Sequence, residues 1–271
     1  MAANLVQTCF MEHLDLVRQQ FGANAANYAT SPVHAKGASL QRLVELLDPQ
    51  PDWSALDVAT AAGHTAFALA PHVREVTASD VTPEMLDVAR QGAADRSLSN
   101  VVFEAADAES LPFADGSFDA VTCRIAPHHF PHPDRFVAEV SRVLRPGGVF
   151  GLVDNVVPDD TIAADFANEW EKRRDPSHLR CLSVDEWLDL MVGRGFDISH
   201  SELMAKRMVF STWVENMNVA PDLCIELLAE LESAPEPARE FLRPELGASG
   251  DQASAAFFLT ECVIVGVKSP S

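Results

Sequence analysis

The sequence predicts an α/β protein with an open, doubly wound and mostly parallel sheet. Between residues 37 and 152, short apolar runs typical of buried strands alternate with helical patterns. A small-residue turn follows the first of these runs, and a long apolar strand lies near the C-terminus. Such alternation is typical of a parallel sheet that helices cover on both faces. Ligands of these sheets bind beyond the carboxyl ends of the strands, so functional residues are expected there.

The individual elements follow from local pattern and from start and stop signals. Short apolar runs predict five strands, over residues 55–59, 75–80, 100–105, 118–124 and 149–154. Helical patterns before and between them predict four helices, over residues 37–47, 65–73, 85–96 and 134–144. Thr82 and Pro83 are typical of a helix start, with Thr82 as the cap and Pro83 at the first position. Arg145-Pro146-Gly147-Gly148 ends the last of these helices.

The pattern changes after Asp154. Residues 155–245 are rich in helical patterns, carry three of the four tryptophans and are expected to include a sixth strand. Residues 255–267 predict a long apolar strand, and residues 247–251 predict the turn that leads into it. The expected organisation is a core, a helix-rich insertion and a C-terminal strand segment, over residues 37–154, 155–245 and 246–271.

The chain is strongly acidic, which bears on its partners. Among 271 residues, 40 acidic side chains against 20 basic ones give a formal net charge of −20. A field of this sign repels phosphate backbones and disfavours nucleic acid as a partner. The sequence has no apolar run long enough to predict a membrane span, and no basic region before an apolar stretch that would predict a secretory signal. We therefore expect a cytoplasmic enzyme. The five cysteines contain no CxxC pair, so neither a disulfide framework nor a zinc ribbon is expected.

The first predicted strand ends in a turn of small residues, Asp57-Val58-Ala59-Thr60-Ala61-Ala62-Gly63-His64. Small side chains let the backbone pass close to a ligand at the start of the next helix. Asp57 is placed to accept a hydrogen bond from a ligand ammonium. A dinucleotide fingerprint would need glycine at positions 59, 61 and 64, which disfavours a nicotinamide oxidoreductase. The alternative is a tight strand-to-helix connection without a ligand.

Acidic residues also follow the second and third predicted strands. Asp80 ends the second strand and is placed to accept two hydrogen bonds from a ribose diol. The alternative role for Asp80 is a helix cap, which Thr82 is expected to provide instead. After the third strand, residues 105–113 offer a carboxylate for an exocyclic amine such as that of adenine, and backbone N–H groups for a ring nitrogen.

Four stretches at these positions resemble class I S-adenosylmethionine-dependent methyltransferases, in particular the small-molecule group that includes the quinone-biosynthesis C-methyltransferases. They are LDVATAAGHTA, VTASDVTPEML, AADAESLPFADGSFD and EVSRVLRPGGVF, and their order and spacing agree with the family over residues 37–154. The terminal FFLTECVIVGVK resembles the last, antiparallel strand of the family. The resemblance implies a Rossmann-like sheet of seven strands and S-adenosylmethionine as cofactor.

The resemblance also implies roles for individual residues. Asp57 and the turn containing Ala59, Ala61 and Gly63 would hold the methionine part of the cofactor. Asp80 with Val81 would contact the ribose, and Asp107 with Ala108 would contact the adenine. Arg124 would lie near the sulfonium and the methionine carboxylate. Ala61 departs from the glycine that is usual in the family, and a positive φ there would cost alanine about 1 kcal/mol.

Upstream of the core, residues 1–36 resemble the helical lid of the family. Phe21 and Tyr28, the single tyrosine, are candidates to fold over the cofactor and its acceptor. A ring facing a sulfonium gains a cation–π attraction of about 1 kcal/mol. The alternative is that both rings pack the first helix onto the sheet.

Candidate acceptor residues follow the fourth strand and lie in the insertion. His128 and His129 are expected nearest the transferred methyl, and histidine can take a phenol or hydroxyl proton near neutral pH. A structural or capping role, or a metal site using His128 and His132, are the alternatives. A basic group in the insertion could receive an acidic acceptor, and it consists of Arg174, His178 and Arg180. The alternative is that these residues form a solvated face.

These observations favour methyl transfer from S-adenosylmethionine to a small-molecule acceptor by in-line displacement. Oxygen or carbon methylation of a phenol-like or quinone-like acceptor is expected, with no metal. The alternative is a cofactor-binding relative without methyl-transfer activity, which the alanine at position 61 favours. The helical insertion could support a homodimer.

Overall fold

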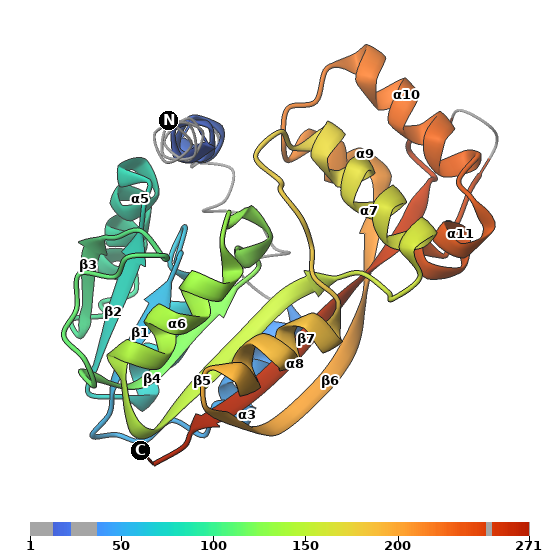
Figure 1. Cartoon of the computed structure of the whole chain (residues 1–271). Helices are drawn as coiled ribbons and strands as arrows, with labels where there is room; N and C mark the ends of the chain where they lie inside the picture. Colours follow the sequence, from blue (N-terminus) through green and yellow to red (C-terminus); the bar gives the residue numbers. More distant parts are fainter. Residues whose placement is uncertain (1–12, 23–36, 248–250, 271) are drawn as a thin grey trace, which may run out of the picture.

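The computed structural model describes residues 13–22, 37–247 and 251–270. Seven strands form one sheet in the order β3-β2-β1-β4-β5-β7-β6 (Figure 1). Pairs among the first five strands are parallel, and β7 is antiparallel to both β5 and β6. The strands are β1 Ser54–Val58, β2 Glu75–Asp80, β3 Val101–Ala105, β4 Phe118–Arg124, β5 Leu144–Val156, β6 Phe196–Val209 and β7 Ala256–Lys268. The predicted doubly wound, mostly parallel seven-stranded sheet with an antiparallel last strand is therefore confirmed.

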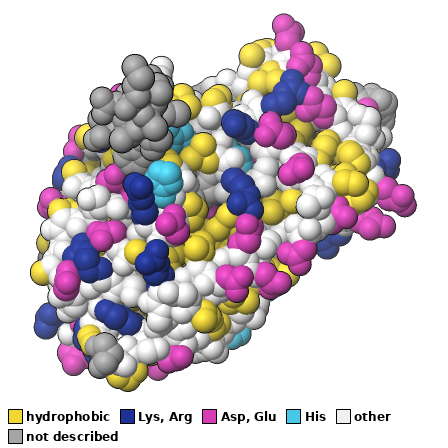
Figure 2. Space-filling view, viewed as in Figure 1, with side chains coloured by type: hydrophobic (Ala, Val, Ile, Leu, Met, Phe, Trp, Pro, Cys, Tyr) yellow, Lys and Arg dark blue, Asp and Glu magenta, His cyan; other side chains and the backbone are white. Residues whose placement is uncertain are grey.

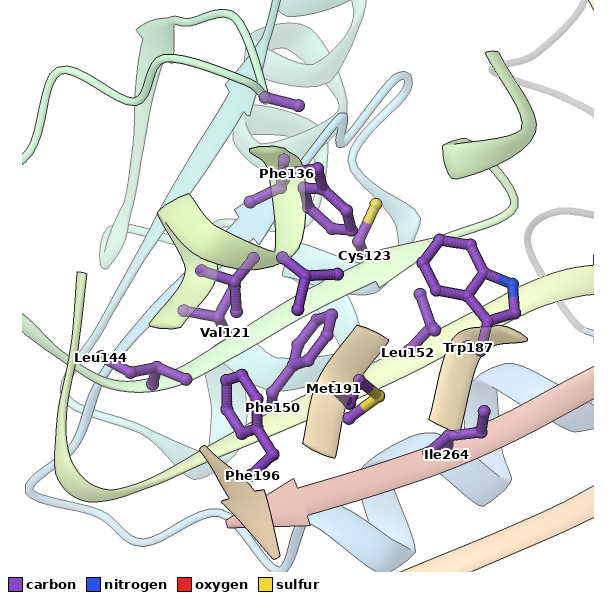
Figure 3. Close-up of a cluster of buried hydrophobic side chains, with 14 of the residues drawn as sticks. Val121, Cys123, Phe136, Leu144, Phe150, Leu152, Trp187, Met191, Phe196 and Ile264 are labelled. Atoms are coloured by element: carbon purple, nitrogen blue, oxygen red, sulfur yellow. The ribbon is translucent and has the colours of Figure 1, made fainter. Parts of the chain in front are cut away.

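Helices cover both faces of the sheet because neighbouring strand residues point to opposite sides. On β5, Leu152 packs with Trp187 of α8 in the largest core, whereas Val153 packs with Leu43 of α3 on the other face. Figure 3 shows the first of these faces, with Phe136 of α6 above the strands. The helices of this layered part are α3 Ala38–Leu47, α4 His64–Leu69, α5 Pro83–Asp95, α6 Pro133–Val143 and α8 Val184–Gly193.

A second group of helices lies where β6 ends and β7 begins (Figure 1), and it encloses a second hydrophobic core. Trp170 stacks on Trp213 with ring centroids 4.2 Å apart, and Phe257 of β7 meets both rings edge-on. Four helices surround this core: α7 Thr161–Arg174, α9 Phe210–Glu215, α10 Pro221–Glu232 and α11 Glu236–Leu242. The predicted insertion is therefore divided, because α8 packs on the sheet with α6 rather than with these helices.

Two local predictions differ from the structure. β5 begins at Leu144 and includes Arg145 to Gly148, which the sequence assigns to a helix end. Leu144 pairs with Phe118 and the register then shifts before Ala120, so a bulged ladder extends the strand backwards. Thr82 stands at the cap position of α5, but its side chain makes no capping hydrogen bond.

Candidate active site

The main cavity opens where the strand order reverses, beyond the carboxyl ends of β1 and β4. Its wall combines the turn after β1, the short helix η2 (Pro127–His129) and parts of α7 and α9. A smaller cavity beside it shares Ala59, Val81 and His129. Figure 2 shows histidine side chains near this region, with acidic and basic side chains intermingled over the visible face.

The turn after β1 has an unusual backbone for its sequence. Ala59 and Ala61 have φ of 52° and 48°, in the left-handed region that favours glycine. Gly63 has φ of 87°, and a Cβ there would lie 2.5 Å from the Phe67 ring. The sequence-based concern about Ala61 is therefore confirmed in its premise, since this position does need a positive φ. We estimate about 1 kcal/mol of strain at each alanine.

Asp80 holds this turn against the start of α5. Its Oδ2 accepts a hydrogen bond from the Ala61 N–H and its Oδ1 accepts one from the Thr82 N–H, both at 2.8 Å. Burial raises the pKa of Asp80, and these N–H donors partly offset that shift. Asp80 thus anchors the backbone of Thr82, which stands at the N-cap position of α5. The Thr82 side chain and the Val81 backbone are further hydrogen-bond partners of this carboxylate.

Asp57 and Arg124 place opposite charges in the floor of the cavity. Asp57 is buried and accepts hydrogen bonds from the hydroxyls of Thr60 (2.6 Å) and Thr122 (2.8 Å). Burial raises the pKa of Asp57 to about 6 against these bonds. Arg124 ends β4 and donates from Nε to Thr65 Oγ1 at 3.1 Å. Both side chains line the cavity, as the sequence-based placement requires.

The smaller cavity contains Asp107 and Ala108 and also a residue that sequence reasoning missed. Glu109 Oε1 accepts the His132 N–H at 2.6 Å, and its Oε2 is buried without a partner among the described residues. Burial raises the pKa of Glu109 to about 7. Asp107 accepts the Glu109 N–H at 2.9 Å, so the two carboxyl groups belong to one turn.

Three buried histidines meet at the centre of the cavity wall. The ring centroid of His128 lies 4.3 Å from that of His129 and 5.4 Å from that of His178. His128 Nδ1 lies 2.6 Å from Asp154 Oδ1, whereas His129 Nδ1 donates to the Ser177 carbonyl at 2.9 Å. Asp154 has no sequence signal of its own, because an acidic residue near a strand end is common. Among the described residues, no three His, Cys, Asp or Glu side chains gather as metal ligands would.

The remaining predicted acceptor residues divide into those that reach the cavity and those that do not. Phe21 lies in the helical residues 13–22, lines the cavity and meets the His129 ring edge-on at 5.0 Å. Arg174 lines the cavity, pairs with Glu171 at 2.8 Å and covers the Trp213 ring. The prediction that Arg180 contacts the acceptor is wrong, because Arg180 is exposed, pairs with Glu186 and does not line the cavity. Tyr28 lies outside the described residues.

The strand order, with a cavity beyond the carboxyl ends of β1 and β4, defines a Rossmann-like α/β fold. A family model described as a methyltransferase domain matches residues 56–152. The chain is 34% identical over 248 residues to the uncharacterized methyltransferase YcgJ of Bacillus subtilis, covering 92% of this chain and 97% of YcgJ. The crystal structure of that YcgJ protein matches with a TM-score of 0.82 at 33% identity, covering 86% of this chain and 99% of that one.

A second relative is the ubiquinone/menaquinone biosynthesis C-methyltransferase UbiE of Brucella canis. It is 36% identical over 140 residues, which cover 50% of this chain and 52% of UbiE. The chain belongs to the class I S-adenosylmethionine-dependent methyltransferases, and it is an enzyme of that family. Within the described residues, no helix combines the length and apolar character that crossing a membrane requires.

Proposed function

We propose that this enzyme transfers a methyl group from S-adenosylmethionine to the oxygen or carbon of a small phenol-like or quinone-like acceptor. The observation that carries the proposal is one continuous cavity wall. It joins the strand-end residues Asp57, Asp80 and Arg124 to the histidines and to the insertion. Bound S-adenosylmethionine supplies an activated methyl group, so the protein has mainly to align the acceptor and exclude water.

The residues present fit this cofactor. Asp57 would pair with its ammonium, and Arg124 would lie near its carboxylate and sulfonium. Asp80, which lines the cavity beside Val81, would accept the ribose hydroxyls. The smaller cavity, with Asp107 and Ala108, would receive the adenine. The turn that contains Ala59, Ala61 and Gly63 would approach the methionine part.

The acceptor would occupy the part of the cavity between η2 and the insertion. Trp213, Met208 and Leu259 give this part an apolar wall that suits a planar ring. Arg174 and His178 contribute polar atoms beside it, and Phe21 closes the side toward His129. His128 and His129 are the candidate proton acceptors.

Calorimetric titration with S-adenosylhomocysteine, followed by a methylation screen of phenols and quinones, tests the proposal. We expect micromolar binding and product from at least one acceptor. Binding without any turnover would favour the alternative, a cofactor-binding relative without activity, which the strained Ala61 motivates. Absence of binding would contradict the cofactor assignment.

Cofactor affinity is expected to depend on pH through Asp57. Its pKa of about 6 means that the carboxylate is ionised above that pH and protonated below it. A proton competes with the ligand ammonium, so S-adenosylhomocysteine affinity should fall by up to about tenfold per pH unit below 6. Calorimetry between pH 7.5 and 5 measures this. Asp57→Asn should bind more weakly and lose the dependence, whereas a flat affinity in the wild type would contradict the ammonium assignment.

Ala61→Gly should leave S-adenosylhomocysteine affinity unchanged or tighten it by up to about fivefold. Glycine adopts the observed φ of 48° without strain, and it removes a methyl group from the cavity wall. The dissociation constant, measured by calorimetry, checks this. Ala93→Gly is the control because Ala93 of α5 is buried, has no positive φ and does not line the cavity, so we expect only a loss of stability there. A marked loss of affinity in Ala61→Gly would show that the turn is adapted to alanine.

A further inference from the structure

Asp154 is the most deeply buried carboxylate beside the cavity. Its side chain is 0% exposed, and its Oδ1 lies 2.6 Å from His128 Nδ1. Its Oδ2 has no hydrogen-bond partner among the described residues. A buried carboxylate with an unpaired oxygen is unfavourable for stability, so its single contact with His128 needs a functional reason.

The contact fixes which nitrogen of His128 is free. A carboxylate only accepts hydrogen bonds, so the proton of the neutral ring must lie on Nδ1. Nε2 then carries a lone pair, and within the described part of the chain it has no hydrogen-bond partner. His128 itself lines the cavity. Its carbonyl accepts the N–H groups of Leu179 and Arg180 at 3.0 and 3.1 Å, which ties its position to the loop after α7.

His129 and His178 have the same ring chemistry but different surroundings. Each has a neutral polar partner, the Ser177 carbonyl for His129 and the Asn168 side chain for His178. Burial and the neighbouring His128 lower the pKa of His129, although Asp175 opposes the shift, and burial with the nearby cationic groups lowers the pKa of His178 to about 2. Both rings therefore stay neutral near pH 7 and are weak proton acceptors.

The groups facing His128 come from four elements. Asp154 of β5, Glu171 of α7 and Asp175 after α7 are acidic, whereas His129 and His178 stay neutral. Burial lowers the pKa of His128, but the three acidic groups outweigh burial and raise it above its ordinary value. Of the three buried histidines, His128 is therefore the one whose pKa is raised rather than lowered.

We propose that Asp154 is the positioning residue that makes His128, rather than His129 or His178, the base for an acceptor with a weakly acidic O–H, a phenol or an enol. This rests on the proposed function and narrows it. The O–H proton passes to His128 Nε2 while an oxygen lone pair forms the bond to the methyl carbon. The C–S bond breaks with its electrons remaining on sulfur, and the imidazolium afterwards releases its proton to water.

The first test measures His128 without any turnover. Histidine ¹⁵N NMR of the S-adenosylhomocysteine complex reports the tautomer and the titration, and His128→Gln assigns the signal. We expect Nδ1–H in the wild type and a titration at least one pH unit lower in Asp154→Asn. Asp159→Asn, an exposed neighbour, is the control and should leave the titration unchanged. An unchanged titration in Asp154→Asn would overturn the proposal. If Asp154→Asn does not fold, the wild-type tautomer decides instead, and an Nε2–H tautomer would overturn the proposal.

The second test varies the acidity of the acceptor. Catechol arrives protonated near neutral pH, whereas 4-nitrocatechol arrives largely ionised and needs no base. We expect His128→Gln and Asp154→Asn to lose at least about 100-fold in kcat on catechol but less than about tenfold on 4-nitrocatechol. Equal losses on both acceptors, or none, would overturn the base assignment. Wild-type enzyme that binds S-adenosylhomocysteine but methylates neither would overturn the acceptor class, and failed binding would instead count against the proposed function.

Discussion

Asp80→Ala is expected to weaken S-adenosylhomocysteine binding by about 1.5–3 kcal/mol, roughly 10- to 150-fold. The carboxylate would no longer accept the ribose hydroxyls, and the turn that approaches the ligand would lose its anchor. Asp80 joins the N–H groups of Ala61 and Thr82 at 2.8 Å each, so the substitution leaves two backbone donors without their acceptor. We therefore expect the free energy of unfolding to fall as well, by about 1–3 kcal/mol for each donor that stays buried.

Calorimetry and urea denaturation of the same samples separate the two effects. Asp80→Asn keeps one acceptor oxygen and should lose less stability than alanine, yet it removes the charge that strengthens the ribose contacts. Glu104→Ala, on the exposed side of β3, is the control and should change neither quantity. A folded Asp80→Ala variant with an unchanged dissociation constant would mean that Asp80 only holds the backbone and that the ribose assignment is wrong.

The sequence predicts the sheet and the neighbourhood of Asp57, Asp80 and Arg124 for one physical reason. Parallel strands bring their carboxyl ends to one edge, so residues far apart in the chain meet without any knowledge of side-chain contacts. The period of the apolar residues is sufficient to place the strands. It does not predict that β5 extends back to Leu144, because that extension depends on pairing with Phe118 across the bulge.

Contacts between side chains do not follow from the local sequence pattern. Asp154 meets His128 across 26 positions, and nothing in the local pattern of either segment indicates the contact. Composition groups Arg180 with Arg174, yet Arg180 is exposed and pairs with Glu186. Glu186 is itself held by a capping box with Ser183 at the start of α8, so the partner of Arg180 is set by a helix that begins after the basic group.

Trp170→Ala is expected to lower the free energy of unfolding by about 3–5 kcal/mol, the range for removing a buried aromatic side chain. Trp170 is 2% exposed and stacks on Trp213. Its Nε1 donates to the Leu227 carbonyl of α10 at 3.0 Å, so the substitution also removes a hydrogen bond between α7 and α10. Urea denaturation followed by fluorescence measures the loss. Trp53→Ala, at a half-buried ring before β1, should be less destabilising.

The same variant tests whether the two halves of the cavity depend on separate cores. Trp213 forms part of the acceptor wall and loses its stacking partner, so the acceptor KM should rise several-fold. The residues proposed for the cofactor instead rest on the sheet, and Trp170 belongs to the core of the insertion. S-adenosylhomocysteine affinity of the folded variant should therefore stay within about threefold of wild type, because substitutions at distant sites act independently. A parallel loss of cofactor affinity would show that the insertion shapes both halves of the cavity.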